Sequence, residues 1–137
     1  MQQRQPDLNR SRVEAWVLAY ERAWRTAGTE PLRELFAGDA TYSMGPYQDP
    51  ARGLEKIGDL WERERRGADE EFEMEHRVVA VEGDTAVVRV EVEYGPPQRL
   101  EYRDLWIVRF DSNGRCREFE EWPFWPDQQV VAQGANR

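Results

Sequence analysis

The chain has 137 residues, of which 39% are hydrophobic and 34% charged, so we expect a single domain with one core. Its formal net charge of −8 repels phosphate groups, which argues against nucleic acid and anionic membranes as partners. No stretch approaches the roughly 20 apolar residues of a spanning helix, and nothing at the start is typical of a signal peptide. The lone cysteine, Cys116, cannot form an internal disulfide, which suits a cytoplasmic location.

The chain is expected to open with a tail and a helix. Residues 1–10 are polar and predict a disordered tail. Ser11 and Glu14 form a capping-box pattern, in which a hydroxyl and a carboxylate cover free backbone N–H groups. Apolar residues at helical spacing then predict a helix to about Ala27, which Gly28 ends.

Two more helices and a strand follow in the first half of the chain. Pro31 suits the first turn of a short helix that ends at Gly38. Alternation over residues 40–44 predicts a strand, and residues 45–53 form a Gly/Pro-rich loop. Apolar spacing over residues 54–67 predicts the third helix.

The second half of the chain alternates with period 2, as strands do. Four strands are predicted in antiparallel order, over residues 71–82, 86–94, 99–110 and 116–122. Helices must cover one face of such a sheet. We therefore predict an α+β domain over residues 11–126, a curved antiparallel sheet wrapped around helices to form a cone-shaped barrel, with a flexible tail over residues 127–137.

Asp104 is the sharpest chemical feature, because it shares a strand face with Tyr102 and Trp106. Burial between two rings raises the pKa of a carboxyl, which suits a general acid or base. The alternative is a structural aspartate paired with an arginine or tyrosine. His76, the only histidine, lies on the apolar face of its strand and is either the proton partner of Asp104 or a cavity-wall histidine.

Tyr20 faces inward from the first helix, where its phenol could donate to a developing oxyanion or simply pack in the core. We therefore predict Asp104, His76 and Tyr20 as catalytic residues. Glu121 is either a second cavity carboxylate or a solvated charge. Further residues on the inward faces are predicted to bind substrate: Trp16, Trp24, Tyr42, Met44, Trp61, Met74, Val90, Tyr102, Trp106, Phe119 and Glu121. One histidine and one cysteine fall short of the usual metal sets, and phosphate-binding motifs are missing, so we expect no metal and no cofactor.

The outward face of the last two strands predicts an assembly. By alternation it carries Leu105, Ile107 and Trp122 among charged residues, and also Cys116, which we interpret as structural. An apolar patch ringed by charges of both signs suits a two-fold interface, where the surface meets itself. We expect a homodimer. The charged residues of the patch are Arg103, Arg109, Glu118 and Glu120.

Three segments carry a resemblance to a known superfamily: LFAGDATYSM (35–44), ARGLEKIGDLW (51–61) and WIVRFDSNGRCREFEEW (106–122). Their order resembles the nuclear transport factor 2-like superfamily, in particular its SnoaL-like branch, over about residues 12–125. The resemblance implies the cone-shaped fold. It also implies a wide choice of functions, because the superfamily holds polyketide cyclases, ketosteroid isomerases, dehydratases, epoxide hydrolases and non-catalytic binding domains.

The ketosteroid isomerases of this superfamily can be compared residue by residue. Tyr20 matches their oxyanion-hole tyrosine, whereas Met44 occupies the position of their base and Trp106 that of their oxyanion-hole aspartate. The Arg-x-Asp arrangement of the epoxide hydrolases is absent, because Arg103 and Asp104 are adjacent. Two hypotheses remain: a cofactor-free acid–base enzyme that isomerises, dehydrates or cyclises an apolar or aromatic small molecule, or a non-catalytic ligand-binding or dimerisation module.

Overall fold

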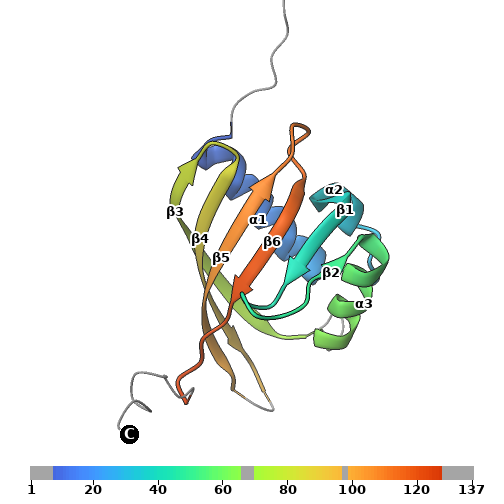
Figure 1. Cartoon of the computed structure of the whole chain (residues 1–137). Coiled ribbons are helices and arrows are strands. Elements are labelled where there is room, and N and C mark those ends of the chain that lie inside the picture. Colours follow the sequence, from blue (N-terminus) through green and yellow to red (C-terminus); the bar gives the residue numbers. More distant parts are fainter. Residues whose placement is uncertain (1–7, 66–69, 97–98, 128–137) are drawn as a thin grey trace, which may run out of the picture.

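A computed structural model describes residues 8–65, 70–96 and 99–127 of the chain. Within these ranges an open sheet carries its helices on one face, so the predicted α+β class is confirmed (Figure 1). The described helices are all too short or too polar to cross a membrane. In chain order the elements are α1 (Arg10–Trp24), α2 (Leu32–Leu35), β1 (Phe36–Ser43), β2 (Ala51–Arg52), α3 (Leu54–Glu64), β3 (Phe72–Glu82), β4 (Thr85–Tyr94), β5 (Glu101–Phe110) and β6 (Cys116–Trp122).

The six strands follow the order β2-β1-β6-β5-β4-β3 across the sheet. The antiparallel series from β3 to β6 agrees with the sequence prediction. However, β1 pairs with β6 in parallel, so the sheet is mixed rather than purely antiparallel and is open rather than a closed barrel. This pairing sets Tyr42 beside Phe119 and brings the first strand to the last. Alternation in the sequence predicts strands but does not name their partners.

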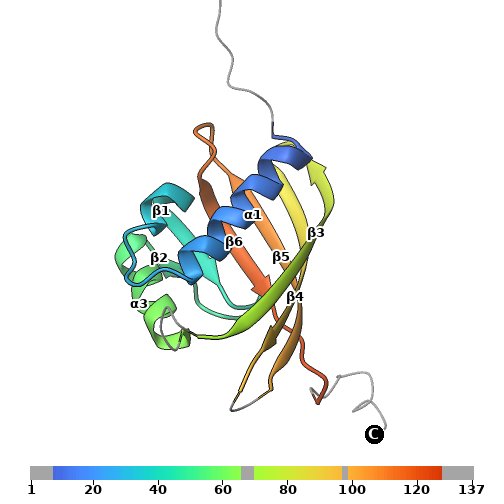
Figure 2. The same ribbon diagram turned by 180° about the vertical axis from the view of Figure 1, so that it is seen from behind.

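Helix α1 crosses one face of the sheet (Figure 2). Its cap is Asn9, whose side chain accepts a hydrogen bond from the Arg12 N–H at 2.9 Å, so the predicted Ser11 capping box is wrong. Trp16 anchors the helix, because its indole N–H donates to the Leu35 carbonyl at 3.0 Å. Aromatic rings surround Trp16 on several sides: those of Tyr20, Phe36, Trp106, Phe110 and Phe119.

The helices are shorter than predicted. α1 ends at Trp24, and α2 is a single turn, after which Phe36 opens β1 where a helix to Gly38 was predicted. α3 ends at Glu64 and packs against β1 and β2. The predicted tails over residues 1–10 and 127–137 lie mostly outside the described residues, although α1 already begins at Arg10.

Two irregularities in the sheet shift the predicted faces. The register shifts between Val78 and Ala80, after which Ala80 is exposed and Val81 packs against the core. A second shift at the start of β6 pairs Cys116 with Phe110. Cys116 is therefore buried in the core and not on the outer face, and burial raises the pKa of its thiol. A bulge inserts one residue, which moves the following side chains to the other face.

Arg65 joins the end of α3 to the end of α1. Its buried guanidinium donates to the carbonyls of Ala23, Trp24, Thr26 and Gly28 at 2.8–3.2 Å, and also pairs with Glu62. The last carbonyls of a helix have no partner within it, and a guanidinium offers five donors. This contact fixes α1 and α3 so that the rings of Trp24 and Trp61 lie 4.8 Å apart between centroids.

Replacing Arg65 with methionine should lower the free energy of unfolding by about 2–4 kcal/mol, because four main-chain carbonyls lose a buried donor. Chemical denaturation measures the change. Glu62→Gln is the matched control and should cost less than about 1 kcal/mol, since the Glu62 side chain is 55% exposed. An Arg65→Met protein as stable as the wild type would contradict this role.

Candidate functional site

A cavity of about 610 Å³ lies between the sheet and the helices, and Tyr20 and Trp24 of α1 contribute to its lining. This volume lies within the range of small-molecule sites, about 300–1,000 Å³. On β5, Val108 and Phe110 are buried in the core that includes Trp16, whereas Tyr102 and Asp104 line the cavity. Among the residues predicted from the sequence, the cavity is lined by Tyr20, Trp24, Tyr42, Met44, Trp61, Met74, Tyr102, Asp104, Trp106 and Glu121.

Four of the residues predicted for the site are not part of the cavity lining. Trp16 on α1, Val90 on β4 and Phe119 on β6 are buried in the core instead. His76 is half-exposed on β3, opposite Val90, which in turn lies opposite Asp104. Two strand spacings of about 4.8 Å each separate His76 from Asp104, which is too far for direct proton transfer.

The chemical partner of Asp104 is instead Glu121. On the sheet Glu121 lies opposite Trp106, which makes Asp104 its diagonal neighbour. The two carboxyls lie close enough for each to shift the pKa of the other, and a hydrogen bond joins them when one of them is protonated. The Tyr42 hydroxyl donates to Glu121 Oε1 at 3.5 Å, and the hydroxyls of Tyr42 and Tyr20 lie 2.7 Å apart. The two carboxyls and the two phenols thus lie next to one another in a continuous series along the cavity wall.

The pKa values of Asp104 and Glu121 are raised to different extents by burial and by the neighbouring acid. Burial raises the pKa of Asp104, and the hydrogen bond from Glu121 opposes that rise. Burial, followed by the hydrogen bond and charge of Asp104, raises the pKa of Glu121 well above its usual range. Glu121 therefore keeps its proton while Asp104 ionises first, as in other carboxyl pairs that share one proton.

Several buried polar atoms of residues that line the cavity have no hydrogen-bond partner among the described residues. Asp104 Oδ1 is buried and accepts no hydrogen bond from the described residues. The indole N–H groups of Trp24 and Trp61 are likewise buried without an acceptor there. Buried polar groups are usually satisfied, so these atoms mark where a ligand would bind. Burial also raises the pKa of the Tyr20 and Tyr42 phenols, which remain donors.

Sequence analysis did not single out the residues at the rim of the cavity. They include Glu64 at the end of α3 and Glu70 and Glu71 just before β3. Phe72 shares a strand face with Met74 and could have been found by alternation, whereas the glutamates carry no pattern that distinguishes them from a solvated surface. Across the described residues no cluster of three or more His, Cys, Asp or Glu side chains is arranged to hold a metal ion.

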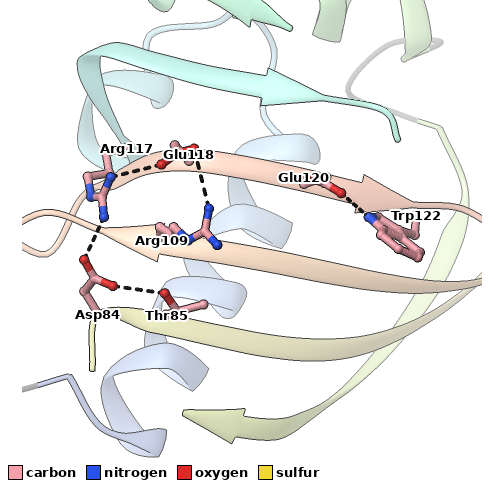
Figure 3. A network of polar contacts seen from close by, with 7 residues as sticks. All are labelled: Asp84, Thr85, Arg109, Arg117, Glu118, Glu120 and Trp122. Atoms are coloured by element: carbon pink, nitrogen blue, oxygen red, sulfur yellow. Dashed lines mark hydrogen bonds and ion pairs between the residues drawn. The ribbon is translucent and has the colours of Figure 1, made fainter. Parts of the chain in front are cut away.

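The opposite face of the sheet carries a network of charges (Figure 3). Arg117 lies 2.7 Å from Asp84 and 3.0 Å from Glu118, and Glu118 also pairs with Arg109 at 3.6 Å. These ion pairs join the β3–β4 turn to β5 and β6. Leu105, Ile107 and Trp122 are half-exposed on β5 and β6 of the same face.

Comparison with known proteins adds a family profile and several solved structures. The profile of the SnoaL-like domain matches residues 17–119. No curated protein matches the chain. A ketosteroid isomerase-like protein from Erwinia carotovora atroseptica SCRI1043 aligns over 87% of this chain and 100% of its own, with a TM-score of 0.60 and 22% identity.

Two further solved structures share the fold. SalBIII, an epoxide hydrolase/cyclase-like enzyme in pyran ring formation of the polyether salinomycin, aligns over 83% of this chain and 91% of its own, with a TM-score of 0.67 and 16% identity. A cystatin-like protein of unknown function from Methylobium petroleophilum PM1 aligns over 93% of this chain and 85% of its own, with a TM-score of 0.68 and 21% identity. At these identities the likeness establishes the fold and no activity.

The carboxyl pair should make stability fall as the pH rises. A raised pKa in the folded state means that the folded protein binds more protons than the unfolded chain. Each carboxyl therefore contributes stability below its unfolded pKa of about 4, and this contribution is lost as the pH rises through its folded value. Asp104→Asn and Glu121→Gln should each flatten this loss in thermal melts from pH 4 to pH 9.

Glu75→Gln, at an exposed position of β3, is the matched control and should keep the wild-type slope. If Asp104→Asn were instead markedly less stable than wild type at pH 7, Asp104 would be a structural aspartate held by a cation.

Proposed function

Because the chain belongs to the SnoaL-like domain family, we propose that it is a cofactor-free acid–base enzyme acting on an apolar or aromatic small molecule. The observation that carries this proposal is the Asp104–Glu121 pair in the wall of an aromatic cavity. A pair that shares one proton offers a base and an acid side by side near neutral pH. Isomerisation, dehydration and ring closure all need these two functions.

Asp104 is the base in this proposal. Its Oδ1 is buried and free to accept a proton from a carbon next to a carbonyl group. Met44, at the position of the base in ketosteroid isomerases, cannot accept a proton, so Asp104 takes over that role from a different strand. After the transfer Asp104 is neutral, and the same proton can return to another atom of the substrate, which balances an isomerisation.

The phenols and Glu121 are the donors. Tyr42 connects Glu121 with Tyr20, and both phenols line the cavity. A donor that faces the carbonyl oxygen stabilises the negative charge that develops there when carbon loses its proton. His76 has no part in this scheme because it does not line the cavity.

The alternative is a binding module without turnover. Met44, which replaces the base of the ketosteroid isomerases, favours the binding module. The aromatic walls of the cavity suit either function. An assay that depends on proton removal alone separates the two, whatever the natural substrate.

We expect the protein to catalyse deuterium exchange at the acidic carbon of 2-tetralone, an aromatic ketone, in D₂O. Wild type should exceed the buffer rate by about 100-fold, and Asp104→Asn should return it to background, as followed by proton NMR. His76→Gln is the matched control and should keep the wild-type rate. Quenching of tryptophan fluorescence by bound 2-tetralone without any exchange would favour the binding module.

We further propose that two copies associate through the outer sheet face. Alternation along β5 places Leu105 and Ile107 on the side opposite Asp104 and Trp106, so this contact leaves the cavity wall free. Charges of both signs, including Arg109 with Glu118, surround these half-exposed side chains. Such a surface can meet its own copy about a two-fold axis.

Ile107→Glu should dissociate this dimer, because it places two like charges at the centre of the contact. Sedimentation at micromolar concentration should then show a dimer for wild type and a monomer for Ile107→Glu. Val79→Glu, at an exposed position of β3, is the control and should remain dimeric. A monomeric wild type would refute the assembly.

A further inference from the structure

We propose that the cavity selects an organic cation, that is, an amine or quaternary ammonium compound with an apolar or aromatic body. This inference rests on the proposed function in that it concerns the same cavity, and it names the class of ligand. It arises from the charges, the free buried atoms and the rings that line the cavity.

The charge of the cavity lining is entirely acidic. Its ionisable groups besides tyrosine are all carboxyls, and its described residues include no lysine, arginine or histidine. An anionic ligand would be repelled here, and a neutral ligand would leave the charges unanswered. The carboxyl-bearing residues are Glu64, Glu70, Glu71, Asp104 and Glu121.

Two arginines close to the cavity, Arg65 and Arg25, already have other partners. Arg65 donates to main-chain carbonyls and pairs with Glu62, and Arg25 pairs with Glu21 at 2.9 Å. Arg25 also donates to the Phe72 carbonyl at 3.0 Å. No ion pair among the described residues reaches any of the five cavity carboxyls, so none of these residues neutralises them.

Buried carboxyl oxygens that accept no hydrogen bond are a second observation, separate from the charge of the lining, that indicates a ligand. Asp104 is only 5% exposed and lines the cavity. Burial raises its pKa. Glu121, Trp106 and the Phe124 main chain lie close to its carboxyl and oppose that rise, but its Oδ1 accepts no hydrogen bond from the described residues. Glu70 Oε1 is also buried without a partner. An ammonium N–H would satisfy either atom, and a quaternary ammonium would satisfy their charge.

Aromatic rings supply the remaining contacts. The cavity lining includes Trp24, Trp61, Trp106, Tyr94 and Tyr102. Ring faces attract cations by their quadrupole, and tryptophan does so most strongly. Rings together with carboxylates form the usual environment for recognition of an ammonium group, and the same rings would cover the apolar body of the ligand.

The approach to the cavity is acidic as well. A neighbouring hollow of about 780 Å³ shares Glu70 and Glu71 with the cavity and is also predominantly acidic. Carboxylates that line an entrance raise the local concentration of cations. The charged residues that this hollow adds are Glu73, Glu93, Glu101, Arg25 and Arg99.

Binding of three matched probes tests the inference: benzyltrimethylammonium, its uncharged isostere neopentylbenzene, and the anion phenylacetate. Tryptophan fluorescence and ligand-observed NMR measure their dissociation constants for the full chain. We expect benzyltrimethylammonium to bind about tenfold more tightly than neopentylbenzene and phenylacetate to bind most weakly.

Glu70→Gln should weaken benzyltrimethylammonium severalfold and leave neopentylbenzene unchanged, whereas Glu75→Gln on the outer side of β3 should change neither. Neopentylbenzene or phenylacetate binding as tightly as the cation, or no binding of benzyltrimethylammonium at about 10 mM, would overturn the inference. These outcomes differ from those of the exchange assay. If the protein catalyses deuterium exchange on 2-tetralone but does not prefer the cation, the proposed function stands and the inferred ligand class is wrong. If it prefers the cation but catalyses no exchange, the ligand class stands and the proposed function is wrong.

Discussion

The packing of α1 over only part of the sheet is the constraint on which the site depends. Trp16 seats the helix over Phe110 and Phe119, and its hydrogen bond to Leu35 fixes that position. The strands continue beyond the helix, so their inward side chains change from core to cavity wall along a single face. A cavity therefore forms without any interruption of the sheet, and rigid elements hold its polar groups.

The mixed sheet determines which polar groups meet in that cavity. The parallel pairing of β1 with β6 brings Tyr42 to the Phe119–Glu121 end of β6, and the antiparallel pairing of β5 with β6 brings Asp104 there from the other side. Glu121 thus lies between a phenol and a carboxyl that are far apart in the sequence. Tyr42 and Glu121 are buried beside other titratable groups. The pKa of each therefore depends on whether its neighbours are protonated.

Sequence alone predicted the class of the fold, the strands from β3 to β6 and the position of Asp104, because period-2 alternation reports directly on sheet faces. Alternation and helical spacing report which face points inward but not which inward residues pack in the core and which line the cavity, so Trp16, Val90 and Phe119 were assigned to the ligand although they form core. Alternation also fails after a bulge, which is why Cys116 lies inside. Asp104 was matched with His76 because both lie on the inward side, and only the register reveals Glu121 as its neighbour.

Among the described residues the cavity carboxyls have no cationic partner, although Arg25 and Arg65 lie close by. Arg65 and Arg25 lie next to the rings of Trp24 and Phe72, yet each donates to main-chain carbonyls and pairs with a glutamate outside the cavity. Pairing them with Asp104 or Glu121 would satisfy those acids, but it would also lower their pKa and remove the shared proton. Buried acids without a cationic partner lower the stability of the fold. Functional sites often include such groups, because stability and function place opposite demands on the same residues. The arginines therefore support the walls of the cavity from outside, while its interior keeps its acidic groups available to the ligand.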